Sequence, residues 1–208
     1  MQIRSLLAAA ALAAVSVACG GGGASVTVNG NLRGQAMKAG DAISAPATIQ
    51  TGAGPASVGA IVITNSGGLC AKVGANQEPK NSQFLLIFLG ELSNTTGSIT
   101  APTSTGTYTV YAGASGTLPP SKLAIVVYSA TDATCKDNTG GTNGISGTVV
   151  LTGNSNGAYT GTFDITVQSQ DTGGSPSGSP EHVTGSFSAS NCAGLSTLIT
   201  QNRTTTCI

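Results

Sequence analysis

The chain has 208 residues, of which only 8% are charged, and its 8 basic and 8 acidic side chains cancel to a formal net charge of +0. In a typical soluble domain, charged residues make up about a quarter of the chain. A chain so weakly charged, and without Trp, lacks both the basic surface and the stacking side chains that nucleic acid requires, which excludes nucleic acid as a partner.

Residues 1–18 have the layout of a secretory signal peptide. Arg4 precedes an apolar stretch over residues 6–17, and the small residue Ala18 follows it. This order of charge, apolar segment and small residue is typical of a cleavable leader. The apolar stretch is about 12 residues long, whereas a membrane-spanning helix needs about 20. A retained transmembrane anchor is therefore not expected.

Cys19 directly follows the predicted cleavage site and opens a run of glycines. This position resembles the lipobox of bacterial lipoproteins, in which the cysteine receives a lipid and becomes the first mature residue. Residues 19–24 are then a lipidated, palmitate-bearing cysteine with a flexible glycine tether, and residues 25–208 a single β-domain. Ser16 departs from the Leu usual in that motif. Residues 16–18 also suit ordinary signal peptidase, which would release a soluble protein.

The first half of the domain predicts two kinds of strand. Residues 24–28 and 107–111 are short and Thr-rich, as edge strands tend to be. Residues 58–63, 84–89 and 123–128 are continuous apolar runs, which indicate strands covered on both faces. Their second face needs a cover. Either residues 31–50 fold over it, or another protein or a ligand does.

The C-terminal half shows clear strand periodicity. Residues 159–168 and 183–189 alternate between an apolar face and a Thr/Ser face, which indicates half-buried antiparallel strands. Residues 147–152 read as the strand before them, with a hairpin turn over residues 153–157. These three strands predict a meander, with the polar segment 171–180 as a mobile hairpin tip.

Taken together, these patterns predict an all-β domain. The expected architecture is an antiparallel β-sandwich, with a partly open β-barrel as the alternative. We expect about 8–10 strands, long polar loops and little helix.

Five cysteines occur in the chain. If Cys19 carries a lipid, an even number remains, which can pair completely in an oxidising compartment. Cys192 and Cys207 lie close together after the last clear strand, so we expect a Cys192–Cys207 bond. Cys70 and Cys135 each follow an apolar run and are expected to form the second bond. The chain has no CxxC spacing that would point to a metal or redox site.

Residues for catalysis are scarce. His182 is the single histidine and lies beside the loop 171–180, a poor place to hold a base, so we expect a surface histidine. No serine lies in a GxSxG elbow, since the one GxSxG spacing, at residues 153–157, falls in the predicted hairpin turn and not between a strand and a helix. Asp132 and Asp137 flank Cys135, but lack the spacing of a calcium loop, which favours an ordinary polar loop. The sequence therefore predicts no catalytic residue, no metal ligand and no cofactor.

The remaining route to catalysis is convergence of carboxylates in space, as in glycoside hydrolases. The eight acidic residues are Asp41, Glu78, Glu91, Asp132, Asp137, Asp164, Asp171 and Glu181. Asp164, on the polar face of a predicted strand, is the one best placed on a rigid element.

Four segments carry a resemblance to a known class of proteins. They are the leader end ACGG (18–21), SGTVVLT (146–152), YTGTFD (159–164) and VTGSF (183–187). Together they resemble uncharacterised bacterial envelope lipoproteins, in which a GTF strand and a VTGSF-like strand pair over a small β-domain. The resemblance covers the leader and part of the C-terminal half. It implies no activity and no catalytic residue.

The sequence thus favours a membrane-tethered, extracytoplasmic lipoprotein with a non-enzymatic structural or binding role in the cell envelope. Its expected location is the outer membrane, held through the N-terminal lipid, with a secreted soluble form as the alternative. Two other functions stay open. One is an envelope hydrolase that uses converging carboxylates, and the other is a subunit of a surface assembly, in which a protein partner or a second copy covers the doubly apolar strands.

Overall fold

The computed structural model describes residues 25–51, 54–93, 95–113, 118–138, 141–171, 175–201 and 205–208. Cys19, the predicted signal peptide and the predicted tether lie outside these residues. The strands are β1 (Val26–Leu32), β2 (Gln35–Ala36), β3 (Asp41–Thr51), β4 (Gly54–Thr64), β5 (Gln77–Glu78), β6 (Gln83–Leu92), β7 (Ile99–Thr100), β8 (Gly106–Val110), β9 (Lys122–Ala130), β10 (Thr142–Ser155), β11 (Ala158–Gln170), β12 (Pro176–Asn191) and β13 (Thr206–Cys207), and the helices are α1 (Leu69–Gly74) and α2 (Ala193–Gln201). The predicted all-β class is confirmed.

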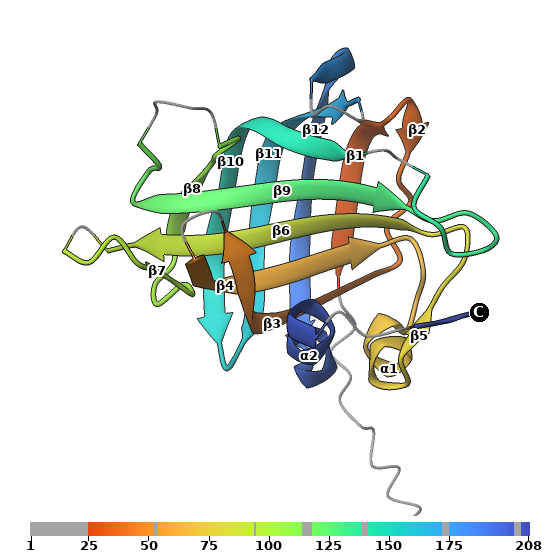
Figure 1. Ribbon diagram of the computed structural model, residues 1–208, viewed down its shortest axis with the longest axis horizontal. Helices are drawn as coiled ribbons and strands as arrows, with labels where there is room; N and C mark the ends of the chain where they lie inside the picture. Colours follow the sequence, from red (N-terminus) through yellow and green to blue (C-terminus); the bar gives the residue numbers. More distant parts are fainter. Residues whose placement is uncertain are drawn as a thin grey trace, which may run out of the picture.

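One strongly curved sheet contains most of these strands. Within the described residues it has 11 strands in the order β11-β10-β8-β9-β6-β4-β3-β12-β1-β2, with β7 on β6. Because β12 also pairs with β11, the path returns to its start, although β3 meets β12 over only two residue pairs. Figure 1 shows β3, β4, β6 and β9 crossing over β10, β11, β12 and β1. This single curled sheet matches the partly open barrel given as the alternative architecture.

The C-terminal meander is confirmed. Strands β10, β11 and β12 pair antiparallel in sequence order. The turn between β10 and β11 consists of Asn156 and Gly157, which both have positive φ, at 51° and 79°. A two-residue turn with both φ values positive suits the right-handed twist of a hairpin, and Asn-Gly is its preferred sequence. The predicted hairpin tip at 171–180 is shorter than expected, because β12 begins at Pro176.

The main core lies between the two crossing layers. One layer contributes the inward side chains of β4, β6 and β9, and the other those of β10, β11 and β12. The largest fully buried side chains of this core are Tyr108, Tyr159, Leu32, Ile61, Ile63, Leu85, Ile87, Leu89, Leu151 and Ile165. The inward residues of β11 and β12 are those that alternate in the sequence, so period two places them on the core side.

Two phenylalanines of this core lie opposite glycines on the neighbouring strand. Phe163 on β11 pairs with Gly185 on β12, and Gly161 on β11 pairs with Phe187 on β12. A Cβ atom at Gly161 would lie 2.9 Å from Cζ of Phe187, and a Cβ atom at Gly185 would overlap the ring of Phe163. Each ring therefore occupies the space that the opposite glycine leaves free, which gives the GTF and VTGSF segments a packing role.

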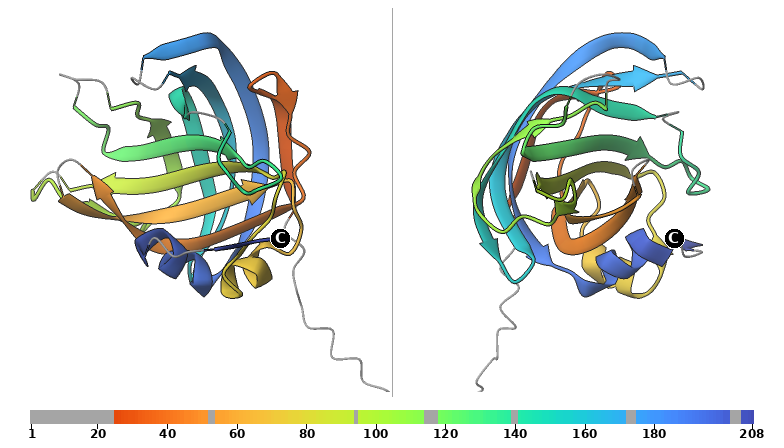
Figure 2. Two further views of the ribbon diagram at one scale, coloured as in Figure 1. Left: turned by 45° about the vertical axis from the view of Figure 1, so that its right-hand side comes forward. Right: turned by 60° about the vertical axis from the view of Figure 1, so that its left-hand side comes forward.

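The second face of β4 is covered by the two helices. The outward residues Val58, Ala60 and Val62 form a second apolar cluster with Leu69 of α1 and Leu195 of α2. Figure 2 shows both helices against this side of the sheet. The expectation that residues 31–50 cover these strands is wrong, since this segment forms β2, β3 and the end of β1 within the sheet.

The outer faces of β6 and β9 are only partly covered. Leu86 and Phe88 of β6 stand opposite Val127 and Ile125 of β9, and all four side chains are half-buried. The prediction that these strands are covered on both faces is thus confirmed for β4. For β6 and β9 it holds only in part. The expected edge position of residues 107–111 is wrong, because β8 lies between β10 and β9.

The predicted disulfide pairing is also wrong. The bonds are Cys70–Cys192 and Cys135–Cys207, instead of Cys192–Cys207 and Cys70–Cys135. The chain between Cys192 and Cys207 forms α2, which carries the two cysteines apart. Cys192 directly precedes α2 and meets Cys70 of α1, while Cys207 lies on β13 and meets the loop after β9.

Candidate functional site

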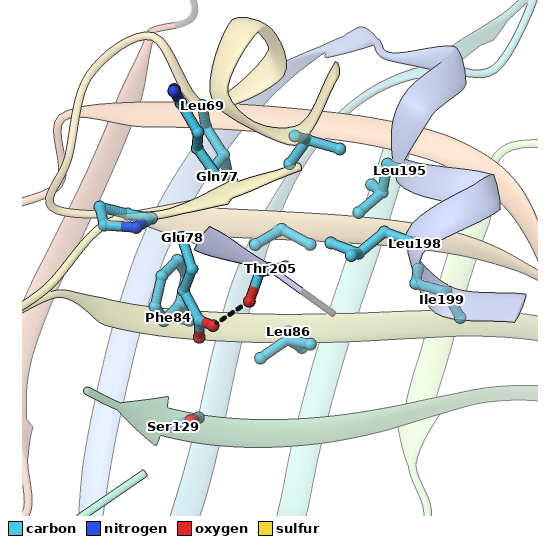
Figure 3. Close-up of a pocket in the computed structure, with 13 residues that line it drawn as sticks. Leu69, Gln77, Glu78, Phe84, Leu86, Ser129, Leu195, Leu198, Ile199 and Thr205 are labelled. Carbon is cyan, nitrogen blue, oxygen red and sulfur yellow. Dashed lines mark hydrogen bonds between the residues drawn. The ribbon is translucent and has the colours of Figure 1, made fainter. Parts of the chain in front are cut away.

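A pocket of about 350 Å³ opens between the two helices and the outer face of the sheet. Figure 3 shows it above β4 and β6, with α1 and α2 on one side. Most of its lining is aliphatic or aromatic. The lining residues are Val62, Leu69, Val73, Gln77, Glu78, Pro79, Phe84, Leu86, Ser129, Leu195, Leu198, Ile199 and Thr205.

The position of each wall follows from the local sequence. Leu195, Leu198 and Ile199 are spaced so that they share one face of α2, which packs on the outer face of β3 and β4. At α1, a carboxylate oxygen of Asp41 accepts a hydrogen bond of 2.8 Å from the backbone N–H of Leu69. This bond satisfies one of the free N–H groups at the helix start and ties α1 to the beginning of β3.

The two disulfides stand at the edges of the pocket. Cys70–Cys192 joins α1 to the start of α2, and Cys135–Cys207 joins the loop after β9 to β13. Strand β13 pairs with β5, which carries Glu78. Both walls are thus covalently joined to segments distant in the sequence, which restricts their movement.

Glu78 is the one ionisable side chain in the lining. It is half-buried, and its Oε2 accepts a hydrogen bond of 2.7 Å from Oγ1 of Thr205. Figure 3 shows the carboxylate turned toward Thr205 within the pocket. No Lys, Arg or His among the described residues forms an ion pair with it. The residues next to Glu78 in the chain do not indicate this position, because the pocket is assembled from distant segments.

The acidic residues singled out in the sequence are spread over the molecule. His182 lies 2.7 Å from Asp164, Nε2 to Oδ1, but the side chains are 63% and 69% exposed on the outer face of β11 and β12. This pair lines none of the three most marked pockets of the described residues. Glu181 instead accepts hydrogen bonds from the backbone N–H groups of Arg33 and Gly34.

The loop between β9 and β10 is held by its own hydrogen bonds. Asp132 accepts bonds from the backbone N–H groups of Thr134 and Lys136, at 2.7 and 3.0 Å. A hydrogen bond from the Thr134 hydroxyl, followed by these two backbone bonds, lowers the pKa of Asp132. Asp137 accepts a bond of 2.9 Å from Ser129. Within the described ranges, no three His, Cys, Asp or Glu side chains gather closely enough to hold a metal ion.

A cluster of polar groups surrounds Glu91 at the end of β6. Its carboxylate accepts hydrogen bonds from Thr103 at 2.6 Å, Tyr108 at 2.8 Å and Ser104 at 3.1 Å, and Lys122 Nζ lies 3.6 Å away. Burial raises the pKa of Glu91, but the hydrogen bonds outweigh it and lower the pKa from 4.5 to about 2. Burial, followed by the bond to Glu91, raises the pKa of Tyr108. All of these partners of Glu91 belong to the chain itself, and they lie on β8, on β9 and in the loop before β8. The cluster is therefore suited to joining β6, β8 and β9.

Glu91→Gln should lower the free energy of unfolding at neutral pH by about 1–3 kcal/mol, because the replacement weakens hydrogen bonds to a charged acceptor. The folded pKa lies below the unfolded one, so the carboxylate stabilises the fold above about pH 4.5 and loses this effect as the pH falls toward about 2. Urea unfolding of both proteins should show their difference shrinking across this window. A difference that stays constant down to about pH 2 would contradict the prediction.

A second pocket, of about 510 Å³, is mostly polar. Its wall includes Arg33, Asn65, Gln83 and Tyr128. Several of these groups bind one another: Gln83 donates from its side-chain nitrogen to the Tyr128 hydroxyl at 3.1 Å, and its backbone N–H donates to Asn65 Oδ1 at 2.8 Å. Burial raises the pKa of Tyr128. These bonds join parts of the polar wall to one another.

Neither helix in the described part of the chain is long and apolar enough to cross a membrane. Comparison with known proteins finds no matching family model, no matching curated protein and no matching solved structure. The candidate site therefore rests on the geometry of this chain alone.

Proposed function

We propose that this protein is a membrane-tethered, extracytoplasmic lipoprotein whose β-domain has a non-enzymatic binding or structural role in the cell envelope. The observation that carries the proposal is the use of the cysteines. Four of the five are joined in two bonds, so Cys19 has no cysteine of this chain left to pair with. A free thiol at the start of a secreted protein is unusual, whereas a lipid on Cys19 accounts for it.

The binding role is supported by the apolar pocket, whose walls two disulfides join to distant segments of the chain. Its volume of about 350 Å³ lies within the range of small-molecule sites. Catalysis has less support, since the His182–Asp164 pair is exposed and the pocket lining holds a single carboxylate.

Cys19→Ser is expected to move the protein from the membrane fraction to the soluble extracytoplasmic fraction, because the substitution removes the proposed lipid attachment site. Residues 16–18 still permit cleavage by ordinary signal peptidase. Fractionation followed by mass spectrometry of the N-terminal peptide measures both location and lipid. Ser16→Ala, which leaves the cysteine intact, is the control and should stay in membranes. Retention of the Cys19→Ser protein in membranes would contradict the proposal.

A role as an assembly subunit is the second candidate. It is favoured by the half-buried apolar side chains Leu86, Phe88, Ile125 and Val127, which form one patch across β6 and β9. The released Cys19→Ser protein also addresses this candidate. An oligomer in light scattering supports the assembly role, and a monomer at all concentrations argues against it.

A further inference from the structure

We propose that the pocket between α1, α2 and the outer face of β4 and β6 binds one hydrocarbon chain of an amphiphile whose polar end donates hydrogen bonds, an ammonium or a hydroxyl group. The proposal builds on the tethered-lipoprotein function proposed above and assigns a ligand class to its pocket.

The lining fits a single hydrocarbon chain. Leu69, Val73, Phe84, Leu195 and Leu198 come from three different elements and present apolar side chains to the same space. Burial of hydrocarbon against such walls is favourable by about 25 cal/mol per Å² of surface removed from water. The volume of about 350 Å³ is near the lower end for ligand sites, which fits one chain better than the paired chains of a bilayer lipid.

The carboxylate of Glu78 determines which polar group the ligand can carry. An ionised carboxylate only accepts hydrogen bonds, and in the described residues the single donor to it is Thr205. Among the described residues no Lys, Arg or His pairs with this half-buried carboxylate, and a hydrogen-bond donor on the ligand would give it a further partner. A ligand ammonium or hydroxyl would therefore be favoured at this end of the pocket. A carboxylate or phosphate on the ligand would meet like charge and be rejected.

The start of the described chain lies near the helices. Val26 of β1 pairs with Phe187, and Ser25 accepts a hydrogen bond from Ser188, shortly before β12 leads into α2. Even fully extended, the chain from Cys19 to Ser25 reaches about 20 Å. A lipid on Cys19 would hold this end of the domain, with its pocket, close to the bilayer, where single-chain amphiphiles concentrate. This proximity favours an amphiphile over a water-soluble apolar molecule.

The test uses the Cys19→Ser protein, which needs no detergent, and two probes of equal chain length. At neutral pH dodecylamine is a cation and laurate an anion. Calorimetric titration below the micelle concentrations should show dodecylamine binding at least about tenfold more tightly than laurate. Glu78→Gln keeps an acceptor for Thr205 and should bring the two affinities to within about threefold, mainly by weakening dodecylamine. Asp164→Asn removes an exposed carboxylate outside the pocket and should leave the ratio unchanged.

The apolar walls are tested on α2. Leu198→Gln places a polar group in the lining and should weaken both probes, whereas Thr200→Gln, on the exposed side of the same helix, should weaken neither. Urea unfolding verifies that each variant is folded. Laurate binding as tight as dodecylamine, a preference that survives Glu78→Gln, or unchanged affinities in Leu198→Gln would each overturn the proposal.

A second arm identifies the source of the ligand. Dodecylamine is offered in phosphatidylcholine vesicles, and the protein fraction is separated and analysed for the amine. Capture from vesicles supports the site with a ligand drawn from the bilayer, and binding only from solution supports it with a free amphiphile. Absence of binding in both arms overturns it. None of these measurements needs a lipid on Cys19, so their failure is distinct from membrane retention of the Cys19→Ser protein.

Discussion

Replacing both Cys70 and Cys192 by Ala is expected to lower the free energy of unfolding by about 4–5 kcal/mol. The bond closes a loop with a sequence separation of 122, and the loss of this cross-link lets the unfolded chain gain conformational entropy of that order. Globular domains are stable by about 5–15 kcal/mol, so the loss is a large part of the total. Urea unfolding of the oxidised proteins, followed by circular dichroism, measures it.

The matched control replaces Cys135 and Cys207 by Ala. This bond has a separation of 72, so the entropy term alone is about 0.5 kcal/mol smaller. Cys192 is also buried against α1 and β3, whereas Cys207 is exposed. Loss of the first bond should therefore increase amide exchange in α2, and loss of the second should not. Two results would show that Cys70–Cys192 does not fix the helices. One is a loss of unfolding free energy below about 1 kcal/mol without this bond, and the other is a larger loss in the Cys135/Cys207 control.

The C-terminal meander could be predicted from the sequence because its signals are local. Period two in residues 159–168 and 183–189 places alternate side chains on the core side, and the Asn156–Gly157 turn sets the hairpin register. Apolar runs likewise indicated that strands such as β4 are covered on both faces. Each of these inferences needs only the neighbours along one strand.

The disulfide pairing and the pocket could not be predicted in the same way. Both depend on α2 returning to the outer face of β4, a contact between segments far apart in the chain. A local signal for α2 exists in the helical spacing of Leu195, Leu198 and Ile199. Cys192 and Cys207 flank this segment, so a helix there would have kept them apart. Glu78 has no local signal, because its surroundings come from α2, β6 and the C-terminal segment.

Gly185→Ala should destabilise the protein by about 3 kcal/mol, the upper part of the range for overpacking a core. An added Cβ would overlap the carbonyl oxygen of Thr27 on β1 and the ring of Phe163 on β11, and paired backbone cannot move aside without breaking the sheet. Urea unfolding measures the loss. Gly74→Ala, where a Cβ meets nothing within 4 Å, is the control and should be neutral or slightly stabilising.

A Phe163→Leu background separates the two overlaps. There the overlap with the ring is gone while the overlap with Thr27 stays, so the cost of Gly185→Ala should fall only in part. An unchanged cost would assign the constraint to the β1 backbone alone, and a cost near zero in the wild-type background would refute the ring-over-glycine packing of the GTF and VTGSF strands.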